Sequence, residues 1–179
     1  FRVTIVRKKN PPAAVTSGAA LGGHLEGEVR IERRVDGGAV VVDAGPDELG
    51  RADTSGGAVR REITQRLKRA RNLAGPDLPL RLHLHDTRHT AVANAVAAVE
   101  AGVAVLDASI GGAGGCPFAP IATGNVATED LVYLFDRTGV ATGIHLRELV
   151  AATAWLAETL GKRLPGALPR AGSFPTTKA

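Results

Sequence analysis

The sequence is poor in the residues that mark several classes of protein. Among its 179 residues there is no methionine and one cysteine, Cys116, which excludes an internal disulfide and a multi-cysteine metal site. Aromatic residues make up 3% of the chain, so we expect a core of aliphatic side chains. No apolar run approaches the roughly 18 residues needed to cross a bilayer, and the N-terminal residues lack the apolar core of a signal peptide. We therefore expect a cytoplasmic protein with no membrane partner.

The length and the first residue bear on how much of a protein the chain represents. A chain that begins at Phe1 and contains no methionine is expected to be a fragment. Its 179 residues suffice for one domain but fall short of the roughly 250 residues of a complete (β/α)8 barrel. We expect a single domain over residues 1–179, with a Pro/Gly-rich C-terminal tail over residues 164–179.

Periodic apolar residues predict strands and helices that alternate along the chain. Strands are expected at residues 1–6, 15–23, 49–53, 80–85 and 103–108, and helices at 59–73, in the alanine-rich stretch that ends at 101, from 128 onward, and at 145–160. Segment 31–43 fits neither pattern because Gly37 and Gly38 interrupt it. The alternation is typical of an α/β protein with parallel strands, in which functional residues lie at the carboxyl ends of the strands.

The predicted strand at residues 80–85 carries two histidines. Successive side chains of a strand point to opposite faces, so His83 and His85 share one face while three leucines share the other. Two imidazoles at a strand end can bind a first-row divalent metal together. The alternative is a pair of polar residues on a solvated strand face, which the following Asp86-Thr87 disfavours.

A glycine-rich loop leads to the cysteine. Four of the five residues at 111–115 are glycine, so the backbone can adopt positive φ and approach a ligand closely. Placed after a strand, this loop is a candidate lid or anion cradle that presents Cys116 to an active site. A tight turn around a buried thiol is the usual interpretation of a lone cysteine. The neighbouring histidine strand favours the reactive thiol here.

Asn125 and the residues after it are further candidates. The Asn125 amide oxygen is a hard donor that could complete a mixed nitrogen and oxygen metal site with the histidines, although an isolated Asn is more often a cap or turn residue. Thr128 is expected to cap a helix whose first turn holds Glu129 and Asp130, because acidic side chains there suit the helix dipole.

Basic residues concentrate on the predicted helix at 59–73 and contribute to a net charge of +4. They are Arg60, Arg61, Arg66, Lys68, Arg69 and Arg71. A solvated outer face is the expected role, with contact to nucleic acid or to coenzyme phosphates as the alternative. No aromatic side chains accompany them for base stacking, so we expect no nucleic-acid partner.

Three segments resemble the 3-hydroxy-3-methylglutaryl-CoA lyase family. They are His83–Thr87, Gly114–Ala119 and Thr123–Tyr133, which match that family in residue identity and in the spacing between segments. Clear resemblance covers residues 80–145, and fainter resemblance extends upstream to about residue 15. The resemblance implies that the chain holds roughly the C-terminal half of a TIM (β/α)8 barrel.

The resemblance also implies a carbon–carbon lyase of leucine degradation that cleaves 3-hydroxy-3-methylglutaryl-CoA to acetyl-CoA and acetoacetate. Its cofactor would be Mg2+ or Mn2+, bound by His83, His85 and Asn125. In this family a further Asp ligand and a catalytic Arg come from the first strand, which the matched segments do not include. An acyl-CoA substrate and a homodimer are implied as partners.

Roles for the remaining candidates follow from the same resemblance. Cys116 would give a proton to the departing acetyl-CoA enolate, and His83 would take part in proton transfer as well as in metal binding. Asp53 would position or polarise the substrate, and Glu129 would support the loop that holds Asn125 and Cys116.

Alternative functions stay open from the sequence. Enzymes of the isopropylmalate and homocitrate synthase type share the His-x-His strand but generally lack a Gly-Gly-Cys-Pro loop, and a related acyl-CoA lyase is a nearer alternative. A non-catalytic barrel remnant is the alternative from another class, because Gly23-His24 stands where the family usually has Cys-Pro.

Overall fold

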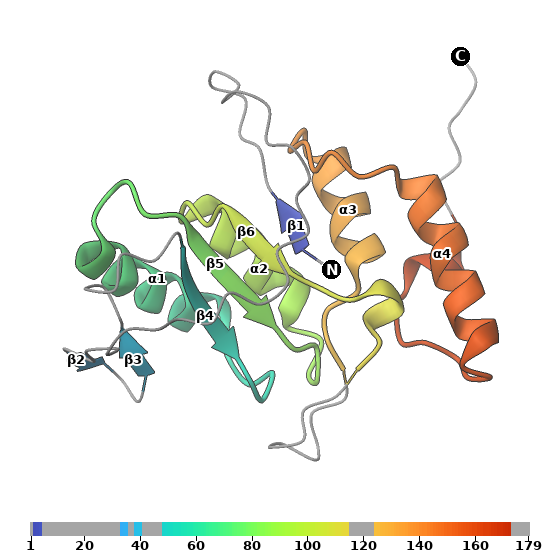
Figure 1. The fold of residues 1–179 in the computed structure, drawn as a ribbon, viewed down its shortest axis with the longest axis horizontal. Coiled ribbons are helices and arrows are strands. Elements are labelled where there is room, and N and C mark those ends of the chain that lie inside the picture. The colour runs from blue at the N-terminus through green and yellow to red at the C-terminus, as the bar shows by residue number, and fades with distance from the viewer. Residues whose placement is uncertain (1, 5–32, 36–37, 41–47, 115–123, 173–179) are drawn as a thin grey trace, which may run out of the picture.

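A four-stranded sheet with helices along one face forms the body of the protein (Figure 1). The computed structural model describes residues 2–4, 33–35, 38–40, 48–114 and 124–172. The strand order is β1 (Arg2–Thr4), β6 (Val105–Asp107), β5 (Leu80–Leu84) and β4 (Leu49–Asp53). A separate hairpin pairs β2 (Arg33–Val35) with β3 (Gly38–Val40), so the segment without a clear pattern contains two short strands.

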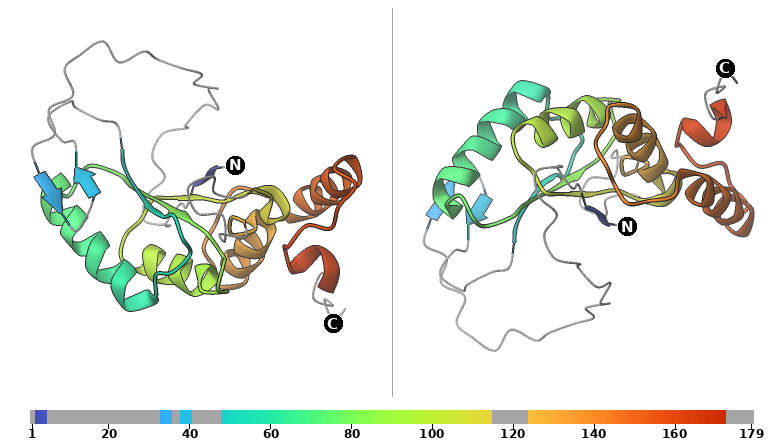
Figure 2. Two further views of the ribbon diagram at one scale, coloured as in Figure 1. Left: turned by 90° about the horizontal axis from the view of Figure 1, so that it is seen from below. Right: turned by 90° about the horizontal axis from the view of Figure 1, so that it is seen from above.

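Helices follow the strands in the order that the apolar periodicity predicts. The helices are α1 (Arg60–Ala74), α2 (Ala91–Glu100), the 3-10 turn η1 (Ile110–Gly112), α3 (Thr128–Arg137), α4 (Leu146–Thr159) and α5 (Leu168–Ala171). Figure 2 shows α1, α2 and α3 in an arc along one side of β4, β5 and β6, as in a segment of a (β/α)8 barrel. The α/β prediction is confirmed, and the strand expected at residues 15–23 lies outside the described residues.

One strand differs from the predicted parallel arrangement. β4, β5 and β6 are parallel to one another, whereas β1 pairs with β6 in the antiparallel sense. The outer edge of β6 would otherwise present unpaired N–H and C=O groups, and an edge strand of either direction satisfies them. Local periodicity predicts a strand near the N-terminus but carries no information on its direction.

The core lies between the sheet and the helices. The three leucines of β5 are buried, with Leu80 and Leu84 fully inaccessible. Ile63, Leu67 and Ala70 of α1 meet them at helical spacing, as predicted for this segment. The alanines of α2 add little bulk, which lets that helix lie close to the same face. Burial of the leucine face fixes the opposite face of β5 as the one that carries the histidines.

The C-terminal segment is more than a tail. Residues 164–172 include α5, and Leu164 and Leu168 are buried at 7% exposure each. The Asp130 carboxylate of α3 accepts hydrogen bonds from the backbone amides of Ala167 and Leu168 at 2.8 and 2.7 Å. The prediction of a tail from residue 164 is therefore wrong as far as residue 172, because two buried leucines and these hydrogen bonds attach the segment to α3.

No helix in the described part of the chain is both long enough and apolar enough to cross a bilayer.

Arg71 departs from the predicted solvated basic face. Its guanidinium donates to the carbonyl oxygens of Gly75 at 3.1 Å, Pro76 at 3.2 Å and Leu78 at 2.6 Å. These carbonyls belong to the turn between α1 and β5, where the backbone has no ladder partners. Arg71 thus satisfies the carbonyl oxygens of the turn that connects α1 to β5.

We expect the substitution Arg71→Met to lower the free energy of unfolding by about 1–3 kcal/mol, because it removes donors from partly buried carbonyls while keeping the apolar stem. Urea denaturation followed by circular dichroism measures this. Arg61→Met is the matched control, since Arg61 is an exposed residue of the same helix and a surface change there should cost less than about 0.5 kcal/mol. Equal effects of the two substitutions would contradict the assignment.

Candidate active site

Segment 124–128 crosses the carboxyl ends of β5 and β6 and forms the frame of the site. The Val126 amide donates to the Leu84 carbonyl at 3.1 Å, and the Val126 carbonyl accepts from the Ser109 amide at 3.1 Å. The Thr128 amide donates to the Ser109 carbonyl at 2.9 Å. The segment is therefore hydrogen-bonded to β5 and to the residues after β6 at once, which places its side chains at the strand ends.

The two predicted histidines lie together at this frame. The ring centroids of His83 and His85 are 4.8 Å apart. His85 is buried, and its Nδ1 lies 3.1 Å from the backbone carbonyl of Asp53. A carbonyl only accepts, so Nδ1 carries the proton and Nε2 keeps a lone pair. Burial and the nearby His85 ring lower the pKa of His83, which keeps the His83 ring neutral and able to coordinate at neutral pH.

Asn125 lies beside both histidines. It forms an isolated antiparallel bridge with His85, and its side chain lies close enough to His83 to oppose the lowering of the His83 pKa by burial. The Asn125 Nδ2 donates to the Ala113 carbonyl at 2.9 Å. This bond identifies the amide nitrogen, because a carbonyl oxygen can only accept. The amide oxygen Oδ1 is therefore the atom that can accept a hydrogen bond or coordinate a metal ion.

These three side chains fit a divalent cation that takes mixed nitrogen and oxygen ligands. They offer one ring nitrogen from each of two imidazoles and one amide oxygen. Within the described residues, no group of three or more His, Cys, Asp and Glu side chains could hold a metal ion. The donors found here form part of a coordination sphere, since Mg2+ and Mn2+ prefer about six ligands.

A charged cluster that the sequence did not predict adjoins the histidines. Arg81 donates to Asp107 at 2.6 Å through Nε and to Glu48 at 2.9 Å through Nη1. Asp107 is paired in register with His83, so the cluster lies on the histidine face of the sheet. The hydrogen bond to Asp107 raises the pKa of Arg81, and Glu48 adds to the effect. Only sheet pairing could reveal this cluster, because its residues are far apart in the sequence.

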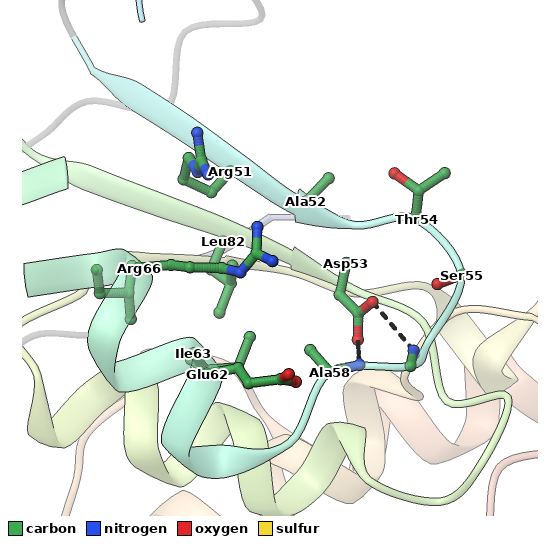
Figure 3. A pocket seen from close by; sticks show the side chains of 12 residues that line it. Arg51, Ala52, Asp53, Thr54, Ser55, Ala58, Glu62, Ile63, Arg66 and Leu82 are labelled. Carbon is green, nitrogen blue, oxygen red and sulfur yellow. Dashed lines mark hydrogen bonds between the residues drawn. The ribbon is translucent and has the colours of Figure 1, made fainter. Parts of the chain in front are cut away.

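The Asp53 side chain does not join the histidines. In the β4–β5 register Asp53 pairs with Leu84, so its side chain lies on the helix-covered face. Its two carboxylate oxygens accept from the amides of Gly57 at 3.1 Å and Ala58 at 3.0 Å, as Figure 3 shows. They border a separate cavity of about 430 Å3 between β4 and α1. Asp53 therefore reaches the histidines through its backbone carbonyl, which lies against His85, while its carboxylate bonds the amides that precede α1.

Glu129 is fully buried, and its contact is with the predicted loop. Its Oε2 accepts from the Gly111 amide at 3.0 Å, and its Oε1 has no hydrogen-bond partner among the described residues. Burial raises the pKa of the Glu129 carboxyl. The predicted support of the loop thus has a physical counterpart at Gly111, while Cys116 itself lies outside the described residues.

The predicted cap of α3 is wrong by one residue. Ala127 occupies the N-cap position, and Thr128 is the first helical residue. Its buried hydroxyl has no hydrogen-bond partner within the described part of the chain. The strand-like pairing of Ser109 with Ala127 sets where the helix begins, and it overrides the local preference of threonine for the cap.

Comparison with known proteins gives a consistent family. The model of the HMGL-like family matches residues 14–156. The chain is 44% identical over 167 residues to the (R)-citramalyl-CoA lyase of Chloroflexus aurantiacus, covering 93% of this chain and 52% of that protein. It is 40% identical over 140 residues to a hydroxymethylglutaryl-CoA lyase of Bacillus subtilis, covering 78% of this chain and 46% of that protein.

A solved structure agrees in fold. An HMG-CoA lyase from Acinetobacter baumannii, in complex with coenzyme A and 3-methylmalate, is similar with a TM-score of 0.69 and 37% identity, covering 76% of this chain and 44% of that one. The chain thus spans about half the length of the relatives that it matches.

Buried Glu129 makes stability depend on pH in a defined direction. Its pKa is raised in the folded state, so folding favours the protonated form, and the stability associated with that proton is lost as the pH rises from the ordinary carboxyl pKa through the folded one. We expect Glu129→Gln to gain stability relative to wild type as the pH rises above the ordinary carboxyl pKa of about 4.3. Urea denaturation at a series of pH values from that pKa upward tests it, with the exposed Glu158→Gln as control. Parallel curves for wild type and Glu129→Gln would contradict the burial effect.

Proposed function

The chain belongs to the HMGL-like family, and on that premise we propose that the protein containing it is a carbon–carbon lyase that cleaves 3-hydroxy-3-methylglutaryl-CoA to acetyl-CoA and acetoacetate. The observation that carries the proposal is the meeting of His83, His85 and Asn125 at the carboxyl ends of the strands. In barrels of this kind active sites lie at that end. The lyases of Bacillus subtilis and Chloroflexus aurantiacus among the relatives support the same chemistry.

The three side chains suit the oxygens of such a substrate. A bound Mg2+ or Mn2+ would polarise the substrate hydroxyl and the oxygens beside it, which stabilises negative charge as the hydroxyl proton leaves. His85 is held in one tautomer by the Asp53 carbonyl, and Asn125 is held in one orientation by the Ala113 carbonyl. Both donors are therefore preorganised, so little reorganisation is needed when the substrate binds.

The cleavage itself requires two proton movements. The hydroxyl loses its proton, the bond between the carbinol carbon and the acetyl-CoA methylene breaks, and the electron pair leaves on the acetyl-CoA fragment as an enolate that must gain a proton. By the family resemblance, His83 takes part in the transfer of the first proton as well as in metal binding, and its ring is partly accessible. Cys116, four residues after the η1 turn in the sequence, is the proposed donor of the second.

We propose an acyl-CoA thioester as the substrate, a homodimer as the assembly and the cytoplasm as the location. The coenzyme A complex of the similar Acinetobacter baumannii enzyme supports the first of these. Low aromatic content continues to disfavour a nucleic-acid role.

Citramalyl-CoA is a second candidate substrate. The relative from Chloroflexus aurantiacus that acts on it matches 93% of this chain, more than the 78% matched by the Bacillus subtilis enzyme. Both thioesters carry a tertiary alcohol at the same position relative to the thioester, and they differ by one methylene in the acidic arm. The same bond breaks in both, with pyruvate in place of acetoacetate as the second product.

The first test measures acetyl-CoA release by the purified polypeptide that carries this chain. We expect release from 3-hydroxy-3-methylglutaryl-CoA that depends on added Mg2+ or Mn2+ and stops with EDTA. Faster release from citramalyl-CoA would favour the second candidate. Condensation of acetyl-CoA with a 2-oxo acid would show an enzyme of the synthase type, and no turnover of any of these would overturn the lyase proposal.

A pair of variants separates the proton donor from the metal ligands. Cys116→Ala should lower kcat by about 100-fold to 10,000-fold with Mn2+ affinity retained, as expected for loss of a general acid. His85→Ala should weaken Mn2+ binding by at least about tenfold. Isothermal titration with Mn2+ and the acetyl-CoA assay measure both, with exposed His145→Ala as the matched control. Undiminished turnover in Cys116→Ala would remove the cysteine from the mechanism.

A further inference from the structure

The turn over residues 109–113 decides how the Asn125 amide points. The Ala113 carbonyl accepts from Asn125 Nδ2 at 2.9 Å and from the Ser109 hydroxyl at 2.5 Å. The turn is closed by the Gly112 amide, which donates to the Ser109 carbonyl at 3.0 Å. A shift of this turn would move the acceptor that fixes the Asn125 side chain.

The C-terminal segment 164–168 packs directly behind this turn. The Gly166 amide donates to the Gly111 carbonyl at 2.9 Å. A Cβ at Gly111 would lie 2.8 Å from the Leu164 Cβ, and one at Gly112 would lie 3.1 Å from the Pro165 ring. The segment and the turn approach so closely that neither glycine has room for a side chain.

Glu129 and Gly166 share one space at this contact. Glu129 Oε2 accepts from the Gly111 amide, and a Cβ at Gly166 would lie 2.5 Å from Glu129 Oε1. The φ angle of Gly166 is not in the left-handed region, so its backbone would tolerate another residue. The nearest atom that a side chain at this position would meet is Oε1 of the Glu129 carboxyl group, followed by the Ala127 Cβ at 3.2 Å.

Asp130 ties the segment to α3 next to this contact. Its two carboxylate oxygens accept from the amides of Ala167 and Leu168 at 2.8 and 2.7 Å. Consecutive residues of α3 thus hold both sides of the contact, since Glu129 bonds the turn and Asp130 bonds the segment. Asn125 lies four residues before Glu129 in the chain, in the segment that leads into α3.

We propose that residues 164–168 form a strap that positions the Asn125 amide for catalysis, with Asp130 and Gly166 as its positioning residues. The catalytic part of this inference rests on the proposed function. The effect on metal binding does not, because it can be measured without turnover. By holding the 109–113 turn from behind, the strap keeps the Ala113 carbonyl where it orients Asn125.

Asp130→Asn is the first test, because it replaces one acceptor by an NH2 group that faces a backbone N–H. We expect at least a tenfold loss of Mn2+ affinity, at least a tenfold fall in kcat and a KM for the acyl-CoA within about twofold of wild type. Amide hydrogen exchange at Gly111 and Gly166 should become at least about tenfold faster. Asp136→Asn, an exposed acidic residue of the same helix, is the matched control and should leave all four values unchanged.

A double-mutant cycle tests Gly166 and serves if Asp130→Asn does not fold. Gly166→Ala should lower Mn2+ affinity and kcat about tenfold in the wild-type background, because the new methyl group displaces the Glu129 carboxyl. In a Glu129→Ala background, where that space is vacant, it should have less than a twofold further effect. Equal losses in both backgrounds would overturn the role of Gly166.

The outcomes separate the strap from the proposed function. Unchanged Mn2+ affinity and unchanged exchange at Gly111 in Asp130→Asn and Gly166→Ala would overturn the strap. If the wild-type protein turns over neither thioester, the proposed function fails, while the Mn2+ titration and the exchange rates still decide on the strap. Losses in these two variants but not in Asp136→Asn would support it.

Discussion

The backbone pairing of segment 124–128 with the ends of two neighbouring strands is the constraint on which the site depends. Parallel strands end at the same edge of a sheet, so a segment that bonds to Leu84 on one strand and to Ser109 beyond the next must lie across that edge. This crossing brings Asn125 beside His85 and also sets the residue at which α3 begins. The donor set and the helix that supports it therefore have one cause.

The division of the sheet into two faces gives each group a separate task. The leucines of β5 are buried under α1 and α2, and the histidines lie on the other face. Asp53 serves both faces, because its carboxylate bonds the amides before α1 while its carbonyl orients the His85 ring. The hydrophobic core and the ring that is proposed to bind metal are thus coupled through a single residue at the end of β4.

Close approach of backbone segments around Gly111 comes at the cost of a buried carboxyl group. Glu129 is removed from water, which raises its pKa, and the Gly111 amide offsets part of that cost. Glycine is required at the contact because Leu164 and Glu129 fill the volume that side chains would need. The arrangement joins the turn, the start of α3 and the C-terminal segment at a point adjacent to the site, and it gives the C-terminal segment a role in positioning.

By itself, the sequence determined what depends on neighbours along the chain. Apolar periodicity was enough for the bounds of β4, for those of α1 to within one residue at each end, and for the common face of His83 and His85, because strand and helix geometry repeats over a few residues. The resemblance to the lyase family added the prediction that Asn125 joins the two histidines in one site. Tertiary structure alone decided the direction of β1, the face on which the Asp53 carboxylate lies, and the attachment of residues 164–172 to α3. Each of these depends on hydrogen bonds and packing between segments distant in sequence, whose partners are fixed only when the sheet and helices assemble.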